Sequence, residues 1–277
     1  MSILAISSQV VAGHVGNSAA QFVLQVLGHD VWAVPTVLLS HHPGHARPAG
    51  RATSADELAA LLASLTDGGW MESVSAVMTG YFASPQQTEI AAQTIRTLTT
   101  ARPGLPVLID PIIGDADEAG TRVYVADGVP EAIRDTLMPL ATMTTPNVFE
   151  LSILTDTPWP LRDPSAIFKA AMALPAPETL VTSVPGSSPG MIANLAFDGK
   201  TLTRHETPMS LSPPNGVGDV TAAVYLGNRL KGVPVSKAAA AATGTVSALI
   251  ARARNDNLRE LPLIAGRADI VDASSAG

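Results

Sequence analysis

Cysteine is absent from the 277-residue chain, and aromatic residues make up only 4% of it. Without cysteine the protein can form no disulfide, no thiolate zinc site and no cysteine nucleophile. Charged residues are also scarce, at 15%, and their net charge of −7 provides no basic surface for nucleic acid or an anionic membrane. With 46% hydrophobic residues, the composition is typical of a globular protein with a large core.

Long apolar runs are missing as well. No uninterrupted apolar segment reaches the roughly 18 residues that are needed to cross a bilayer. The first residues lack a basic region, and Ser7, Ser8 and Gln9 interrupt their apolar run, so they make a poor signal peptide and a better first strand. We therefore expect a cytoplasmic protein with neither a membrane nor a nucleic acid as its partner.

What the sequence does contain is a repeated alternation of short apolar runs and helix-like segments. Strands are predicted at residues 2–10, 30–39, 74–79, 106–113, 141–145 and 179–184, and a hairpin at 194–197 and 201–205. Helices are predicted at 18–27, 129–139, 148–154, 219–230 and 236–254, and behind the caps Ser54, Ser84 and Asp163. This alternation predicts an α/β fold with a mostly parallel central sheet and helices on both faces. No linker or internal repeat divides the chain, so residues 1–277 are predicted to form a single domain.

Polar residues gather where the predicted strands end. In parallel α/β sheets, ligands bind beyond the carboxyl ends of the strands. The residues at or just beyond those ends include Ser8, Gln9, Tyr81, Asp110, Asp115, Thr145, Asn147, Thr182 and Ser183. The sheet itself needs none of these polar groups. Their convergence on one edge therefore predicts a binding site there.

The stretch at residues 212–223, SPPNGVGDVTAA, places a flexible turn and one acid at the start of a predicted helix. Gly216, Val217 and Gly218 can present consecutive backbone N–H groups to an anion, because glycine has no Cβ and tolerates positive φ. The helix that begins near Asp219 adds its partial positive charge. Asp219 could then take the proton of an attacking hydroxyl in phosphoryl transfer. Judged from this turn alone, a simple helix cap is the more frequent explanation.

Two other phosphate-binding motifs are excluded. Gly199, Lys200 and Thr201 have the order that ends a Walker A loop, but Asn194 stands where that motif requires glycine, and the segment is a predicted hairpin. No Gly-x-Gly-x-x-Gly motif follows a predicted strand, which disfavours a dinucleotide-binding fold.

Six motifs follow one another in the order found in pyridoxal kinases of the ribokinase-like superfamily: SSQVVAGHVGNSAA, TGYFAS, IDPIIGD, TPNVFEL, VTS and NGVGDVTAA. The chain resembles this family from about residue 3 to residue 270. The segment GHVGNSAA is the specific part, because sugar kinases of the superfamily lack it. The resemblance implies a ribokinase-like fold without a separate lid domain, a homodimer, and ATP-dependent phosphorylation of the 5′-hydroxymethyl group of pyridoxal, pyridoxine or pyridoxamine.

The resemblance also implies roles for individual residues. For catalysis it implies Asp219 as the base and an anion hole formed by the amides of Gly216, Val217, Gly218 and Asp219. For ATP it implies Asp110, Asp115, Asn147, Glu150, Thr182, Ser183 and Gly218. For magnesium and potassium it implies Asp110, Glu150, Thr145 and Thr182. For the vitamin it implies Ser8, Val15, Val37, His42, Tyr81 and Asp219.

The chain departs from the family's pattern on the vitamin side. Gln9 stands where many members have histidine. In the lid segment, residues 39–50, Leu39, Pro43 and His45 occur in place of the aromatic walls, and no tryptophan is present. The histidines of this segment have no carboxylate nearby at ligand spacing, which favours a polar lid over a zinc site. The departures concern vitamer preference, whereas the phosphate-binding turn is intact.

Two alternatives remain open from the sequence. A hydroxymethylpyrimidine kinase, or another ribokinase-like kinase of small alcohols, would use the same turn, although GHVGN favours the vitamin. A non-catalytic vitamin-binding protein that kept the fold would account for the altered lid segment. The presence of Asp110, Glu150 and Asp219 argues against this second alternative.

Overall fold

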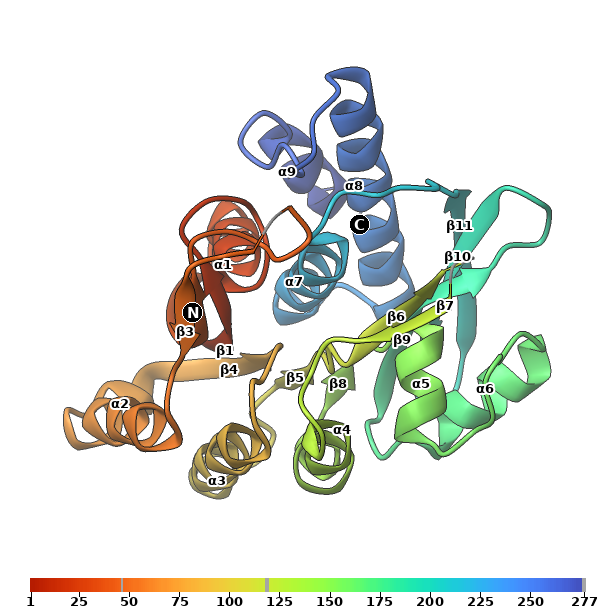
Figure 1. Cartoon of the computed structure of the whole chain (residues 1–277). Coiled ribbons are helices and arrows are strands. Elements are labelled where there is room, and N and C mark those ends of the chain that lie inside the picture. Colours follow the sequence, from red (N-terminus) through yellow and green to blue (C-terminus); the bar gives the residue numbers. More distant parts are fainter. Residues whose placement is uncertain (46, 118–119, 276–277) are drawn as a thin grey trace.

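The computed structural model describes residues 1–45, 47–117 and 120–275, and within them the centre is a nine-stranded sheet of order β11-β10-β9-β8-β5-β4-β1-β2-β3 (Figure 1). The parallel strands are β1 (Ser2–Val10), β2 (Asp30–Leu39), β4 (Val74–Thr79), β5 (Val107–Ile109), β8 (Met143–Thr144) and β9 (Glu178–Pro185). The antiparallel strands lie at the edges and are β3 (Gly50–Ala52), β10 (Met191–Phe197) and β11 (Leu202–Pro208). The predicted mostly parallel sheet is confirmed.

Helices cover both faces of this sheet (Figure 1). One face carries α1 (Asn17–Val26), α7 (Val217–Leu230), α8 (Val235–Asn255) and α9 (Arg267–Ser275). The other carries α2 (Ala55–Asp67), α3 (Pro85–Ala101), α4 (Val129–Ala132), α5 (Val148–Leu154) and α6 (Pro164–Ala173). Alternate residues of β1 enter two separate apolar clusters, Ile3 and Ala5 on the α1 side and Leu4 and Ile6 on the α3 side. Burial on both faces explains why this strand is apolar almost throughout.

Three helix starts are set by the caps that the sequence predicts. The side chains of Ser54, Ser84 and Asp163 accept hydrogen bonds from backbone N–H groups of the first turns of α2, α3 and α6. The capping box predicted at Ser18 is wrong, because Gly16 is the N-cap of α1. The Ser18 hydroxyl instead donates to the carbonyl of Val10 at 2.8 Å and so ties α1 to the end of β1.

Several short elements differ from the prediction. The strand expected at 106–113 ends at Ile109, and Ile112 has a φ of 39°, which turns the chain away from the sheet. The helix expected at 129–139 is α4 followed by one π-helical and one 3₁₀ turn. Strand β3, helix α9 and the hairpin of β6 (Gly114–Asp117) and β7 (Gly120–Val123) were not predicted. The hairpin escapes detection because its strands are polar and carry no apolar alternation.

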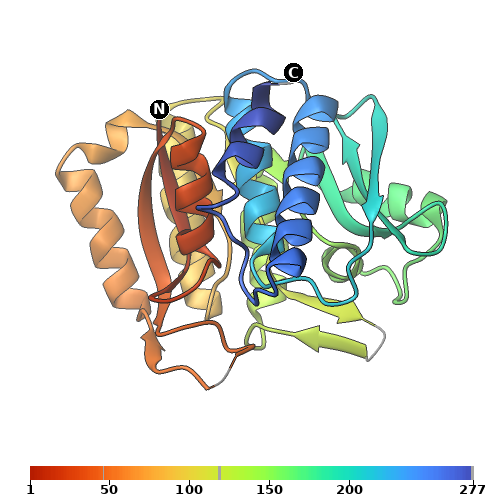
Figure 2. The same ribbon diagram turned by 90° about the horizontal axis from the view of Figure 1, so that it is seen from above.

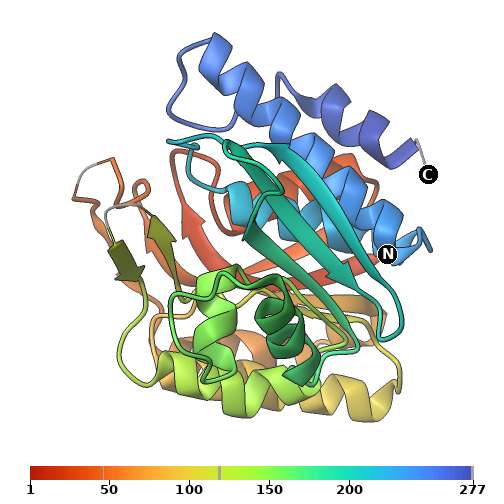
Figure 3. The same cartoon turned by 90° about the vertical axis from the view of Figure 1, so that its right-hand side faces the viewer.

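The unpredicted hairpin helps to locate the site. Figure 2 shows β6 and β7 at the same end of the molecule as the loop between β2 and β3, with both termini at the opposite end. Figure 3 shows the antiparallel strands β10 and β11 at the edge of the sheet, between α8 on one side and α5 and α6 on the other. Among the described residues, no helix is long and apolar enough to cross a membrane.

Candidate active site

The predicted site residues meet at the carboxyl end of the parallel strands. Asp110 follows β5, Thr145 follows β8, and Asp219 lies in the first turn of α7. The charges of Glu150 of α5 and of Asp219 lie close enough to Asp110 to add to the rise that burial causes in the pKa of Asp110. Three acids from distant parts of the sequence therefore share one site, as the strand-end argument predicts.

The glycine-rich turn before α7 packs tightly against the segment that follows β1. Gly216 has a φ of 88°, and a Cβ added there would overlap the carbonyl oxygen of His14. Gly16 has a φ of 54°, and a Cβ added there would overlap Ser8. The N–H of Gly16 in turn donates to the Asp219 carboxylate. The motifs GHVGN and NGVGD thus form one unit, in which close backbone approach requires glycine.

Gly218 has open space beside it, unlike Gly216 and Gly16. A Cβ added at this position would meet no atom within 4 Å, and its φ does not lie in the left-handed region. The fold therefore does not require glycine here, although the position lies in the first turn of α7 beside Asp219. The open space above this backbone, at a helix N-terminus, suits the oxygens of a phosphate group.

Asp219 has the electrostatics of a general base. It is half-buried, and burial raises the pKa of its carboxyl to about 6, although the hydrogen bond from Gly16 opposes that rise. A carboxylate with a pKa near the operating pH is mostly ionised and still basic enough to accept a proton in a transition state.

Asp110 offers one carboxylate oxygen without a protein partner. Its Oδ1 accepts a hydrogen bond from Thr145 Oγ1 at 2.9 Å, whereas Oδ2 is buried and has no partner among the described residues. Burial, followed by the charges of Glu150 and Asp219, raises the pKa of Asp110 well above its usual range. A hard cation would satisfy this oxygen and reverse the unfavourable charge, so the residue fits a magnesium ion. No cluster of three or more His, Asp or Glu ligands occurs within the described residues, so such an ion would take most of its ligands from phosphate and water.

Glu150 and Asn147 act together to shape the loop beyond Asp110. Glu150 Oε1 accepts from the N–H of Ile113 at 2.8 Å and of Gly114 at 3.3 Å, and Oε2 accepts from Asn147 N–H at 2.9 Å. Asn147 completes a capping box with Glu150 and donates from Nδ2 to the carbonyl of Gly114 at 2.8 Å. Burial raises the pKa of Glu150 to about 7 despite these three donors. Both side chains are therefore engaged by the backbone of the loop.

The other residues predicted to bind the nucleotide lie on β6 and at the end of β9. The Asp115 carboxylate on β6 bonds to the hydroxyl of Tyr124, and burial together with this contact raises the pKa of Tyr124. Thr182 N–H donates to the carbonyl of Pro146 at 2.9 Å, which joins the end of β9 to the start of α5. Ser183 is exposed with a φ of 58°, a strained conformation that in a non-glycine residue often marks a functional site. Tyr124 is not among the predicted site residues, because its contact with Asp115 depends on the unpredicted hairpin.

The predicted vitamin side is held by hydrogen bonds around Tyr81. Its N–H donates to Ser7 Oγ at 3.1 Å, and its carbonyl accepts from Thr36 Oγ1 at 2.6 Å. Gln87, which is buried, donates to the carbonyl of Thr36 at 2.9 Å and so fixes this corner. Burial raises the pKa of the half-buried Tyr81. The sequence predicts a helix start at Ser84, three residues before Gln87, but gives no sign of this contact with β2.

The remaining vitamin-side residues come from three segments. Val15 and Val37 are buried, Ser8 is half-buried, and His42 lies in the lid segment, where burial lowers the pKa of its imidazole. Asn17, which is fully buried, donates to the carbonyls of Ser7 at 3.1 Å and Val34 at 3.2 Å, where the register of β1 and β2 shifts. Asn17 thus shapes the end of β1, and its place in GHVGN was the available signal.

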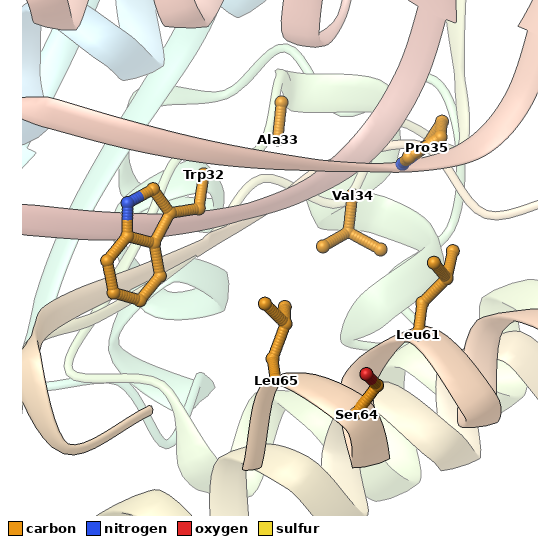
Figure 4. A pocket seen from close by; sticks show the side chains of 7 residues that line it. All are labelled: Trp32, Ala33, Val34, Pro35, Leu61, Ser64 and Leu65. Atoms are coloured by element: carbon orange, nitrogen blue, oxygen red, sulfur yellow. The ribbon is translucent and has the colours of Figure 1, made fainter. Parts of the chain in front are cut away.

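A pocket elsewhere in the molecule does not coincide with this site. It has a volume of about 310 Å³ and lies between the body of β2 and helix α2 (Figure 4). Its lining consists of Trp32, Ala33, Val34, Pro35, Leu61, Ser64 and Leu65. None of these residues has a carboxylate, an imidazole or another group that titrates near neutral pH, so the pocket has no part in the chemistry of the acids.

Comparison with known proteins agrees with this geometry. The model of a family described as phosphomethylpyrimidine kinase matches residues 53–262. A pyridoxal kinase of Granulibacter bethesdensis is 33% identical over 282 residues, covering 99% of this chain and 98% of that protein. A pyridoxine/pyridoxal/pyridoxamine kinase of Bordetella bronchiseptica is 37% identical over 271 residues, covering 96% of this chain and 94% of that protein. The structure of the Leishmania donovani pyridoxal kinase in complex with ADP and pyridoxamine has a TM-score of 0.87 and 27% identity, covering 97% and 95%.

The parallel sheet, the glycine-rich turn and the acids at the strand ends define a small-molecule kinase of the ribokinase-like fold. The chain belongs to the family that the matched model describes and, at 33% and 37% identity over nearly its full length, to the pyridoxal kinases. The resemblance inferred from the six motifs is thereby confirmed.

Proposed function

We propose that the protein transfers the γ-phosphoryl group of ATP to the 5′-hydroxymethyl group of pyridoxal, and also of pyridoxine and pyridoxamine. The observation that carries the proposal is the position of Asp219, a carboxylate with a pKa of about 6 beside the open space over Gly218 at the start of α7. A base and an anion site therefore lie next to each other. The names of the relatives, and the ADP and pyridoxamine in the Leishmania donovani structure, support the choice of substrates.

The proposed reaction needs one proton acceptor and an anion hole. Asp219 takes the proton of the hydroxyl, the oxygen attacks the γ-phosphorus, and the bond to the leaving ADP breaks. The backbone N–H groups of Gly216, Val217, Gly218 and Asp219, together with the N-terminus of α7, stabilise the negative oxygens of the transferring group. Little further covalent chemistry is required, because phosphoryl transfer depends mainly on positioning and charge neutralisation.

A magnesium ion would be held through Asp110 Oδ2 and would neutralise phosphate charge when bound. Thr145 orients Asp110 through its hydrogen bond, and Glu150 with Asn147 fixes the adjoining loop. Asp115, Thr182 and Ser183 are proposed to border the nucleotide. Asp110, Thr145 and Thr182 form the neighbourhood in which we propose a potassium ion, since hydroxyl and carboxylate oxygens suit a hard cation.

On the vitamin side, Ser8, Val15, Val37, His42 and Tyr81 are proposed to contact the pyridine ring. The buried valines supply apolar contact, and the Tyr81 ring can stack on an aromatic face. Ser8 can hydrogen-bond a polar group of the ring edge. Because Gly16 packs directly on Ser8 and donates to Asp219, this arrangement brings the ring close to the base.

We further infer that residues 1–277 act as one kinase unit, because a single sheet carries both the nucleotide and the vitamin side. A homodimer and a cytoplasmic location, where ATP is available, complete the proposal. Sedimentation of the purified protein tests the dimer.

Alanine substitutions of Gly216 and Gly218 distinguish an effect on protein stability from an effect on phosphate binding. Gly216→Ala places a Cβ in a left-handed conformation and against His14, so we expect it to destabilise the protein by about 1–3 kcal/mol and to lower activity. Gly218→Ala meets no atom, so we expect an unchanged melting temperature but at least a tenfold weaker binding of a non-hydrolysable ATP analogue, which carries the γ-phosphate. Calorimetric titration with this analogue and thermal unfolding measure the two effects. Wild-type affinity in Gly218→Ala would show that no phosphate lies over this position.

A substrate panel tests the proposed function. Formation of ADP is measured with pyridoxal, pyridoxine, pyridoxamine and hydroxymethylpyrimidine, each with magnesium ATP and with or without potassium. We expect at least one vitamer to exceed hydroxymethylpyrimidine in kcat/KM by tenfold or more. A preference for the pyrimidine would assign the other kinase activity, and no turnover with any substrate would favour a non-catalytic vitamin-binding protein.

A further inference from the structure

Glu260 lies far from the catalytic residues in sequence, yet its carboxylate joins two segments at the vitamin side. Oε2 accepts a hydrogen bond from His14 N–H at 3.1 Å, and Oε1 is paired with His45 Nε2 of the lid segment. The backbone of Glu260 also pairs with that of Asn215, the residue before the glycine-rich turn. One residue therefore contacts the segment after β1, the lid segment and the start of the phosphate-binding turn.

The packing around this carboxylate is close. Gly13 has a φ of 106°, and a Cβ added there would lie 3.1 Å from both carboxylate oxygens of Glu260. A Cβ added at Gly44 would lie 2.9 Å from His42 Nδ1 and 3.3 Å from Asn215 Nδ2. Glycine at both positions allows the three segments to approach one another.

Apart from Glu260, the start of the lid segment is attached to the segment after β1 by two backbone hydrogen bonds, from Val11 N–H to the carbonyl of Leu39 at 2.9 Å and from Ala12 N–H to that of Ser40 at 3.0 Å. The lid segment contains no Phe, Tyr or Trp that could pack into an aromatic wall. Two of its backbone hydrogen bonds are internal, from Ser40 to Ala49 at 2.7 Å and from His45 to His42 at 3.1 Å. Of the ion pairs among the described residues, the one between His45 and Glu260 alone involves the lid segment.

We propose that Glu260 is a positioning residue that holds the lid segment and the loop of residues 12–16 against the phosphate-binding turn. It acts through His45 and through the N–H of His14, whose carbonyl packs on Gly216. The vitamin side is thereby preformed next to Asp219. This inference rests on the proposed function for its kinetic consequence, whereas the contacts themselves do not depend on it.

Because Glu260 preforms the vitamin side, we expect its loss to change the KM for the vitamin and not kcat. An ordered lid segment reduces the conformational entropy that vitamin binding must otherwise overcome. Glu260 touches neither the phosphate turn nor Asp219 with its side chain, so the chemical step does not depend on it directly. An interaction that stabilises the bound substrate and the transition state equally affects only binding. Its loss raises KM and leaves kcat nearly unchanged.

The kinetic test compares Glu260→Ala and Glu260→Gln with the wild type, with pyridoxal and magnesium ATP as substrates. We expect Glu260→Ala to raise the KM for pyridoxal about tenfold, with kcat and the KM for ATP within about twofold. Glu260→Gln keeps an acceptor for the N–H of His14 but loses the negative charge opposite His45. Its KM for pyridoxal should lie between those of the wild type and Glu260→Ala. Adding His45→Ala to Glu260→Ala should cause little further change, because the pair is already broken. Asp256→Asn, an exposed acid of the same region, is the matched control and should match the wild type.

Hydrogen exchange of the free protein provides a test that is independent of activity. We expect Glu260→Ala to accelerate exchange at least fivefold in peptides covering residues 11–16 and 40–45, with no change in α3. If the wild type fails to phosphorylate pyridoxal, the proposed function fails, and the exchange result alone decides the role of Glu260. Unchanged exchange, or equal effects on the KM for ATP and the KM for pyridoxal, would overturn that role.

Discussion

Asp219→Asn is expected to lower kcat for pyridoxal phosphorylation about a thousandfold, the range that removal of a general base produces. The amide has the shape of the carboxylate and can still accept the N–H of Gly16, so the turn should keep its structure. Dissociation constants of ADP and pyridoxal should therefore stay within about threefold of the wild type. Rapid-quench measurement of a single turnover gives the chemical step directly.

The same variant should be more stable than the wild type at neutral pH. Burial raises the pKa of Asp219 to about 6, so the folded state binds this proton more tightly than the unfolded chain does. The stabilising effect of that proton is present below the ordinary pKa of about 4 and is lost as the pH rises through 6. We expect Asp219→Asn to raise the melting temperature by about 2–4 °C at pH 7.5 and by less at pH 5. An equal change at both pH values would contradict the raised pKa.

The pH dependence of the rate follows from the same carboxyl group. For the wild type, kcat/KM should fall as the pH drops through about 6, because Asp219 becomes protonated and can no longer accept the hydroxyl proton. The residual activity of Asp219→Asn should lack this fall. A shared inflection in both proteins would assign it to another group, such as Glu150, whose pKa burial raises to about 7.

Glu150→Ala is expected to lower the free energy of unfolding by about 2–5 kcal/mol. It leaves the N–H groups of Ile113, Gly114 and Asn147 without their acceptor in a buried position, and each unpaired donor costs about 1–3 kcal/mol. Relief from burying a carboxylate offsets part of this cost. Urea denaturation measures the change. Activity should fall at least a hundredfold, because the loop that follows Asp110 loses its support.

Two variants control this experiment. Glu150→Gln keeps one acceptor oxygen in nearly the same place, so its loss of stability should be about half that of Glu150→Ala. Glu89→Ala removes an exposed carboxylate from α3 and should change stability by less than about 0.5 kcal/mol. If Glu150→Ala were as stable as Glu89→Ala, the loop would not depend on the three hydrogen bonds.

The sequence predicts those parts of the fold that depend on local pattern. Apolar runs bounded by turn residues locate β1, β2, β4 and β9, and caps such as Ser54 locate the helices. The rule that ligands lie at the carboxyl ends of parallel strands then brings Asp110 and Thr145 together, and they are hydrogen-bonded at 2.9 Å. Where a pattern had two explanations, as at Ser18, the tertiary contact with Val10 prevailed over a local cap.

The parts that escaped prediction depend on contacts between distant segments. No spacing rule connects Glu260 with His45, which lie 215 positions apart, so the sequence offers no carboxylate at ligand spacing from the lid histidines, whereas the structure pairs one with His45. By sequence, Gln87 lies at a predicted helix start and Asn17 ends a predicted loop, yet their buried side chains donate to carbonyls of β1 and β2. The hairpin of β6 and β7 is polar and short, so only its pairing in three dimensions reveals it.

The most direct test of the central claim is transfer of labelled phosphate from γ-labelled ATP to pyridoxal by the purified protein, measured beside Asp219→Asn. We predict that the wild type forms pyridoxal 5′-phosphate and ADP in equal amounts and that the variant does so about a thousandfold more slowly. Absence of pyridoxal 5′-phosphate with the wild type, or an undiminished rate with the variant, would contradict the claim that this chain is a pyridoxal kinase with Asp219 as its base.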